Sequence, residues 1–395
     1  MAKRIVIQDY AGHPFQVQLS RKLAERGHSV LHVYAGYNKT PHGSLQKRET
    51  DPSNFDVQGL YIHQPLKKYS YVKRWFQERE YGRLVVDAVK KFKPDTVISA
   101  NMPLDPQAML QQNCLHNHVR LIIWLQDVIS LATKKTLEKK LSWVGGLIGN
   151  YYIAMEKRVL SNSDHIIPIT QGFEPFLCEA GILQSKMTVI PNWTPLDELP
   201  VTPKDNPWSR EHDLVDKFCF MYSGTLGLKH NPDLLLQIAL HFKNNPQVMV
   251  FVGSEGPGAD WLSQKAKDLD LSNLMVMGYQ PMQILPQVLA TGDVLIAILE
   301  AEAGVYSVPA KVLSYLAAQR PLLASLPPNN LAARIIQDQS AGYVVPPGEI
   351  AGMMAKAEEL FYNSSLRATF ARNARHYAEE NFDIERIADR FEALI

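Results

Sequence analysis

The residue best suited to chemistry is Lys311, in the first turn of a short helix that we predict to start near Pro309. A loop that contains Ala303, Gly304 and Ser307 precedes this helix. The start of a helix offers unpaired N–H groups and a partial positive charge, to which the lysine adds a full charge. The segment therefore predicts a phosphate-binding site. The alternative is a helix that only packs on a sheet, because every helix has such an end.

A second lysine-containing loop lies earlier in the same half of the chain. A predicted strand over 217–222 is followed by Gly224, Thr225 and Lys229, and then by a helix over about 232–242. Glycines between a strand and a helix let the backbone approach a ligand closely, and a lysine there can reach a diphosphate. We expect this loop to bind the same anion as Lys311. The alternative is an ordinary loop with a solvated lysine.

Other polar side chains suit acid–base chemistry or sugar binding. Asp127 follows a predicted strand over 121–125 after one intervening residue, Gln126, and the carboxyl end of a parallel strand faces the ligand crevice of a doubly wound sheet. His13 lies in the loop after the first strand, where functional residues concentrate. Glu302 precedes the Lys311 loop and can hydrogen-bond sugar hydroxyls. The alternatives are a helix cap for Asp127, an exposed His13 and a solvated Glu302.

Alternating strands and helices must position these residues. A strand over 3–7, a helix over about 15–26 and a strand over 29–34 predict a βαβ unit, whose first loop lacks GxGxxG. The chain from 38 to 61 is predicted to be irregular. Further apolar strands are predicted over 96–100, 121–125, 217–222, 248–253, 274–278, 294–299 and at the end of 307–325, and the segments 164–170 and 187–190 are expected to finish the first domain. This order predicts an α/β fold.

Length and composition indicate two globular domains. The 395 residues exceed what one core usually holds, and 46% hydrophobic and 21% charged residues are ordinary values. A stretch rich in Pro, Asp and Glu over 194–215 is the predicted linker. No apolar run reaches the roughly 18 residues of a membrane span, and no signal peptide is apparent, so we expect a cytoplasmic location. The three cysteines are scattered and are expected as free thiols in or near cores.

Charge is unevenly distributed around a net value of +1. Residues 1–160 hold 24 Lys and Arg against 13 Asp and Glu, and the remainder holds 17 against 27. The stretch 134–160 places four lysines beside Trp143, Tyr151 and Tyr152, which favours contact with an anionic membrane surface. A buried helical hairpin is the alternative. The basic and aromatic stretch 67–83 is interpreted as a solvated amphipathic helix, and we expect no nucleic-acid partner.

Three segments resemble blocks of the family-4 glycosyltransferases, in the branch that builds bacterial exopolysaccharide and O-antigen repeats. The run VPAKVLSYLAAQRPLLAS is similar to the block PSK…YLA-x-G-x-P, which in that family lies against the diphosphate and ribose of a nucleotide sugar. The run GHPFQVQLSRKLAERGHSV resembles the family's opening block, and Ile190-Pro191-Asn192 resembles its IPN motif. The resemblance spans nearly the whole chain.

The resemblance implies the GT-B fold, in which two doubly wound Rossmann-like domains face each other across a cleft. Residues 1–195 would form the acceptor-side domain and residues 216–381 the domain that binds the nucleotide sugar. A C-terminal helix over about 382–395 would pack back on the first domain.

The implied function is that of a retaining glycosyltransferase, a hexosyltransferase of polysaccharide biosynthesis. It would move a sugar from a nucleotide diphosphate sugar to a hydroxyl of a saccharide or lipid-linked acceptor, in the cytoplasm and on the inner face of the membrane. The sequence shows no metal-binding pattern, and no cofactor is expected. The catalytic candidates are Asp127, His13 and Lys229; the donor-binding candidates are Gly224, Thr225, Lys229, Glu255, Tyr279, Glu302, Ser307, Val308, Lys311 and Ser314.

Positions 225, 306, 314 and 319 depart from the family pattern. Thr225 stands where an arginine often follows the first glycine, so Lys229 carries the charge of that loop. Ser314 stands where many members have a ribose-binding glutamate. Two rival functions therefore stay open: a nucleotide-sugar epimerase of the same architecture, and a non-catalytic protein that binds membrane or nucleic acid.

Overall fold

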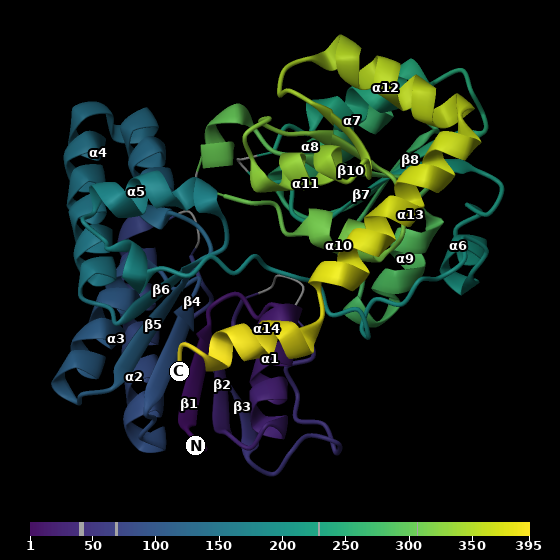
Figure 1. Cartoon of the computed structure of the whole chain (residues 1–395). Helices are drawn as coiled ribbons and strands as arrows, with labels where there is room; N and C mark the ends of the chain where they lie inside the picture. The colour runs from purple at the N-terminus through teal and green to yellow at the C-terminus, as the bar shows by residue number, and fades with distance from the viewer. Residues whose placement is uncertain (39–42, 68–69, 228–229, 306) are drawn as a thin grey trace. The chain divides into compact units, whose positions relative to one another are not determined.

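The computed structural model describes residues 1–38, 43–67, 70–227, 230–305 and 307–395. Within these residues the chain forms two compact units (Figure 1). Unit 1 comprises Met1–Asn192 and Asp383–Ile395, and unit 2 comprises Trp193–Phe382. The chain therefore leaves unit 1 once and returns to it with its last residues.

Unit 1 is built on a sheet that has six strands in the described residues, in the order β3-β2-β1-β4-β5-β6. Apart from the edge strand over 55–60, the strands are mostly apolar and buried, as expected for parallel strands covered by helices on both faces. They are β1 (Arg4–Asp9), β2 (Ser29–Ala35), β3 (Phe55–Leu60), β4 (Thr96–Ala100), β5 (Arg120–Leu125) and β6 (His165–Pro168). The helices are α1 (Pro14–Glu25), α2 (Tyr71–Phe92), α3 (Leu104–His116), α4 (Ile129–Ser161), α5 (Glu174–Glu179) and α14 (Ile384–Glu392).

Unit 2 repeats this topology among its described residues, with the order β12-β11-β10-β7-β8-β9. Its strands are β7 (Phe218–Ser223), β8 (Val248–Gly253), β9 (Leu274–Met277), β10 (Val294–Ile298), β11 (Leu322–Ser325) and β12 (Gly342–Val345). Its helices are α6 (Pro207–Glu211), α7 (Asp233–His241), α8 (Pro257–Asp268), α9 (Leu285–Thr291), α10 (Lys311–Ala317), α11 (Leu331–Asp338), α12 (Ile350–Tyr362) and α13 (Ser364–Asn381).

The strand order reverses at one point in each sheet, between β1 and β4 in unit 1 and between β7 and β10 in unit 2. In open α/β sheets, ligands bind beyond the carboxyl ends of the strands at such a point. The loops after β1 and β7 occupy the same place in the two topologies. These two loops are therefore where each unit is expected to bind a ligand.

The chain end completes unit 1 because α14 packs against α1 (Figure 1). Arg26 Nη1 lies 2.7 Å from the Asp389 carboxylate, and His28 Nε2 lies 2.9 Å from Glu392. Phe391 is fully buried, with its ring centroid 4.8 Å from that of Trp124. Both ion pairing and apolar burial thus hold the helix in place.

Several sequence expectations were wrong in detail. The stretch 38–61, expected to be irregular, contains strand β3 at the sheet edge. The predicted linker contains α6, whose start is stabilised by a reciprocal capping box between Asn206 and Ser209. Cys114 and Cys219 are buried free thiols, but Cys178 is exposed.

Helix α4 is a hairpin rather than one straight helix. Ser142 interrupts it with φ 50° and ψ −130°, so that the chain reverses between two helical halves. Gly145 lies at the contact between the halves: a Cβ there would be 2.1 Å from the carbonyl oxygen of Leu137. The second half still exposes Trp143, Leu147 and Tyr151 by 75%, 62% and 60%. The hairpin alternative is thus correct for the backbone, but these apolar side chains are not buried.

Candidate functional site

In unit 2, Lys311 lies against the loop that follows β7. Its Nζ is 3.5 Å from the ring centroid of Tyr222, a cation–π contact with the penultimate residue of that strand. Gly224 follows the strand with φ +132°, and a Cβ there would lie 3.2 Å from Lys311 Cε and 3.3 Å from Nζ. A glycine is therefore needed for both the backbone conformation and the close approach of the lysine. The structure thus brings Gly224 and Lys311 together.

Tyrosine hydroxyl groups hold this loop. Tyr315, fully buried on α10, accepts a hydrogen bond from Ser223 N at 3.0 Å and donates one to Ser223 O at 3.1 Å. Tyr222 donates to the carbonyl oxygen of Thr225 at 2.7 Å. The Thr225 and Tyr279 hydroxyls lie 3.0 Å apart, which links the loops after β7 and β9. Burial raises the pKa of Tyr222 and Tyr315, so both hydroxyls stay neutral and able to donate.

The other donor-site candidates lie on neighbouring loops of unit 2. Glu255 is exposed after β8, and its Oε1 lies 3.2 Å from the position of a Cβ on Gly278. Ser314, on α10, lies with its Oγ 3.4 Å from Thr194 Oγ1. Lys229 lies outside the described residues.

The remaining three candidates belong to the segment between β10 and α10. Glu302 is exposed in a short 3₁₀ helix (Ala301–Val305), and Val308 is half-buried. Ser307 is buried, and its carbonyl oxygen accepts a hydrogen bond from Asn330 Nδ2 at 2.8 Å. This hydrogen bond therefore fixes the backbone of the segment shortly before Lys311.

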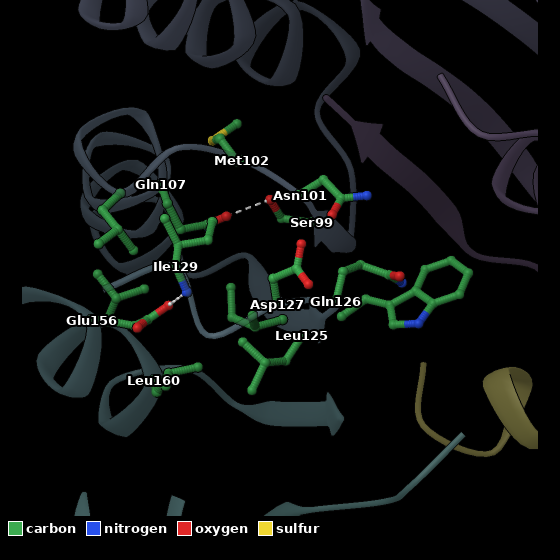
Figure 2. A pocket seen from close by; sticks show the side chains of 14 residues that line it. Ser99, Asn101, Met102, Gln107, Leu125, Gln126, Asp127, Ile129, Glu156 and Leu160 are labelled. Atoms are coloured by element: carbon green, nitrogen blue, oxygen red, sulfur yellow. Dashed lines mark hydrogen bonds between the residues drawn. The ribbon is translucent and has the colours of Figure 1, made fainter. Parts of the chain in front are cut away.

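In unit 1, Asp127 lines a small pocket of about 30 Å³ at the carboxyl ends of β4 and β5. Figure 2 shows its carboxylate directed into the pocket, toward Ser99 and Asn101 at the end of the neighbouring strand. The Ser99 hydroxyl donates to Gln107 Oε1 at 2.7 Å, which fixes the pocket wall. The half-buried Asp127 thus lies at the ligand-facing edge of the sheet, as its position after a strand predicts.

The start of α4 is capped by Glu156, which sequence reasoning missed. Its carboxylate accepts a hydrogen bond from Ile129 N at 3.2 Å (Figure 2). It also accepts from Ser130 N at 3.0 Å and from Ser130 Oγ at 2.5 Å. Burial raises the pKa of Glu156 to about 7, and the charge of Asp127 adds to the increase. Glu156 thus performs the capping that was the alternative role for Asp127. No local signal reveals it, because the capping carboxylate lies 26 residues from Ser130.

His13 starts α1, and its ring stacks on Phe15 with the centroids 5.2 Å apart and the planes at 16°. Phe15 contacts Trp124 edge to face at 5.6 Å. Trp124 is a wall of the Asp127 pocket. The two catalytic candidates of unit 1 are thus joined by two aromatic rings.

Asp9, the last residue of β1, holds the loop that carries His13. Its carboxylate accepts hydrogen bonds from Ala11 N at 2.9 Å and His13 N at 2.5 Å. Asp9 is fully buried, and this burial raises its pKa to about 7. Sequence reasoning did not select Asp9, although it follows a buried strand just as Asp127 does.

The IPN motif closes unit 1 through a paired amide contact. Asn192 Nδ2 donates to Gln126 Oε1 at 2.5 Å, and Gln126 Nε2 donates to Asn192 Oδ1 at 3.1 Å. Gln126 directly precedes Asp127, so this contact fixes the backbone beside the candidate catalytic residue.

Family comparisons cover both units. Residues 205–377 match the family described as glycosyl transferases group 1, and residues 13–193 match the glycosyl transferase 4-like domain. These two ranges include all the candidate site residues named above. Among the described residues, no helix has the length and apolar character needed to cross a membrane.

Two curated relatives have similar sequences. WcaI of Escherichia coli K12, named as a colanic acid biosynthesis glycosyl transferase, is 24% identical over 58% of this chain and 57% of its own length. WbjE of Pseudomonas aeruginosa, named as a glycosyltransferase, is 24% identical over 51% of this chain and 50% of its own length. The chain therefore spans little more than half the length of these relatives.

Structure comparison finds the same fold over the full chain. HepE of Anabaena, solved in complex with UDP-glucose, is 16% identical, covers 99% of both chains and has a TM-score of 0.73. At this identity the match shows the fold alone. Together with the two family matches, it shows that the chain belongs to the family-4 glycosyltransferases and has their GT-B fold of two Rossmann-like domains.

Proposed function

We propose that this protein transfers a sugar from a nucleoside diphosphate sugar to a hydroxyl group of a saccharide or lipid-linked acceptor, with retention at the anomeric carbon. The observation that carries the proposal is the position of Lys311 in unit 2. Its ammonium lies beside Gly224 and over the Tyr222 ring, at the point where the strand order of the sheet reverses. A fixed positive charge beside backbone without a side chain suits a diphosphate.

The chemistry breaks the bond between the anomeric carbon and the diphosphate oxygen and joins that carbon to the acceptor oxygen. Negative charge develops on the departing diphosphate, and Lys311 would stabilise it. Lys229 is proposed for the same role from its place in the sequence. In unit 1, Asp127 would accept the acceptor proton or stabilise positive charge on the sugar, and His13 would contact the acceptor. Retention is proposed from family membership.

The donor class is supported by the relatives as well as by the site. HepE was solved with UDP-glucose, and UDP-glucose is therefore the first donor to test. The loops after β8 and β9 carry Glu255 and Tyr279, which we propose to contact the nucleoside and sugar. WcaI is named for colanic acid biosynthesis, which favours a polysaccharide or its lipid-linked precursor as acceptor.

We also propose that unit 1 works on an anionic membrane surface, at the cytoplasmic face. The exposed Trp143, Leu147 and Tyr151 recur every four residues along the second half of α4, so they share one helix face. Val72 and Phe76, on α2, are 69% and 61% exposed. Large exposed apolar side chains on neighbouring helices are typical of a docking surface.

Basic residues accompany these apolar side chains. Lys140 Nζ lies 5.2 Å from the ring centroid of Tyr71, so the α4 hairpin and the start of α2 are in contact. Lys134, Lys135 and Lys139 belong to the same hairpin. Each basic residue near an anionic leaflet contributes about 1 kcal/mol, and aromatic side chains prefer the interface. Both properties together favour a lipid surface and a lipid-linked acceptor.

The function is tested by incubating the protein with a panel of labelled nucleotide sugars, beginning with UDP-glucose, and with bacterial lipid extract. Label transferred into the lipid fraction, with the anomeric configuration of the donor kept in the product by NMR, would support the proposal. Binding of the nucleotide sugar without transfer to any acceptor, or epimerised free sugar nucleotide, would contradict it.

A further inference from the structure

The loop after β1 encloses a carboxylate of the chain itself. Asp9 Oδ1 accepts the Ala11 N–H and Oδ2 accepts the His13 N–H, at 2.9 and 2.5 Å, and the Gly12 N–H faces the same carboxylate. Gly12 has φ 76°, the left-handed conformation that lets three successive N–H groups turn toward one point. In doubly wound folds the loop at this place commonly gives its N–H groups to a bound phosphate.

Gln16 completes the enclosure from the first turns of α1. Its side chain is fully buried, and with the amide oriented to donate, Nε2 lies 2.5 and 2.7 Å from the two Asp9 oxygens. The carboxylate therefore receives donors from the loop on one side and from the helix on the other. A buried charge is tolerated only when it is satisfied in this way.

We propose that Asp9 is a positioning residue that acts as an internal anion: it holds the loop of residues 10–13 in the shape that presents His13 to the acceptor. The proposal rests on the acceptor-side role proposed for His13. Its consequence is that the loop of unit 1 has no N–H groups left for a phosphate, so the nucleotide binds to unit 2.

The arrangement of donors suits the ionised carboxylate, which predominates above pH 7 because burial raises the pKa of Asp9 to about 7. Both carboxylate oxygens accept from backbone N–H groups, so the NH₂ group of an asparagine would oppose an N–H group in either orientation. Asp9→Asn should therefore disturb the loop although it keeps the volume. Asp9→Ala removes the carboxylate and leaves a space of formate size that is lined by donors.

Asp95 provides a matched control. It directly precedes β4 and contacts the first residue of β1, at the end of that strand opposite Asp9. Its Oδ2 accepts a hydrogen bond from Arg4 N at 2.8 Å, and the residue is exposed. Asp95→Asn thus changes a carboxylate bound to the β1 backbone without touching the His13 loop.

Two measurements test the proposal on the full chain. Steady-state kinetics should show that Asp9→Asn and Asp9→Ala lower kcat/KM for the acceptor by about 10²-fold, as expected for a misplaced contact, while KM for the donor stays unchanged. Sodium formate should restore part of the Asp9→Ala activity in a saturable way. Formate should also raise the Tm of Asp9→Ala, but not that of the wild type or of Asp95→Asn.

The outcomes separate this proposal from the transferase function. If no protein transfers sugar, the formate-dependent rise in Tm still reports whether the loop encloses an anion. A folded Asp9→Ala whose Tm ignores formate would overturn the proposal, as would an Asp9→Asn with the acceptor kinetics of the wild type. If Asp9→Ala does not fold, the acceptor kinetics of Asp9→Asn decide, with Asp95→Asn as the reference.

Discussion

The two units place different residues at the same point of one topology. The first strand of unit 1 ends in Asp9 and that of unit 2 ends in Ser223, each beside the point where strand order reverses. In unit 1 the following N–H groups bind the Asp9 carboxylate. In unit 2 the strand end is held by the neutral Tyr315 hydroxyl, and the nearby charge is the Lys311 ammonium.

Because the two topologies are the same, the fold alone does not determine whether such a loop can bind an anion. A carboxylate at the strand end accepts hydrogen bonds from the loop N–H groups and repels phosphate. A serine carries no charge, so the backbone there is held by a neutral hydroxyl and lies near a lysine. The loop of unit 2, Ser223 to Asn231, contains no acidic residue in its sequence.

The largest effect is expected from removing the cation of unit 2. Lys311→Ala should lower kcat/KM by at least about 10²-fold, because one group that stabilises developing charge is lost. Lys229→Ala is expected to act likewise. Steady-state kinetics with the best donor of the panel measure both. Lys243→Ala, which alters an exposed lysine of unit 2 bound to the Leu269 carbonyl, is the control. An unchanged kcat/KM would remove that lysine from the site.

On the unit 1 side, Asp127→Asn should lower kcat by about 10²-fold and leave the donor KM unchanged, since the carboxylate serves the acceptor or the reacting sugar. Because Glu156 already caps α4, the variant should melt at the wild-type temperature. Activity and Tm are measured on the same preparation. Normal activity with a lowered Tm would instead make Asp127 a structural residue.

The membrane-binding surface of the protein is expected to lie on unit 1. Replacing Trp143 and Leu147 with aspartate should weaken binding to acidic vesicles by about tenfold or more, because both side chains are exposed and negative charge is added. Liposome flotation with acidic and neutral lipids measures this at low and high salt, and salt should weaken wild-type binding.

A control for the flotation experiment lies in unit 2. Tyr362 is 79% exposed there, so Tyr362→Asp removes an exposed aromatic residue outside the proposed surface. Equal recovery of the wild type on neutral and acidic vesicles, or no recovery on acidic ones at low salt, would refute membrane docking by unit 1.

The smallest effect concerns the pH dependence of stability. Burial raises the pKa of Asp9 from its ordinary 3.8 to about 7, so the folded state binds the proton more tightly than the unfolded state. The stability from this group is present below pH 4 and is lost as the pH rises to 7. Asp9→Asn should flatten this part of the stability curve, as should Glu156→Gln, whose carboxyl has a pKa raised to about 7.

Urea unfolding between pH 4 and 8 measures these slopes. Asp95→Asn serves as the control because the side chain of Asp95 is exposed. An identical slope in Asp9→Asn and the wild type would show that Asp9 remains charged throughout this range.

Local sequence determined most of the architecture. Short apolar runs such as those over 96–100 and 248–253 are buried parallel strands, because such runs are stable only between two layers of helices. The motif around Lys311 and the glycine at 224 are the basis for proposing unit 2 as the donor half, since a lysine and a glycine act through properties that need no distant partner. Strand β3 escaped notice because only Phe55 and Leu60 of it are buried at the sheet edge.

Only the tertiary structure decided which polar groups are paired and which apolar groups are exposed. Glu156 caps a helix start 26 residues away, and Tyr315 reaches a strand end 92 residues away. Trp143 and Phe76 are exposed, but the sequences of their helices do not distinguish an exposed apolar side chain from a buried one. Hydrogen bonding and burial depend on which segments meet in space. The order of residues along the chain does not specify the distances between those segments. For this reason Asp9, which looks like any strand-end acid, is distinguished from Asp127 only by the donors that surround it in the fold.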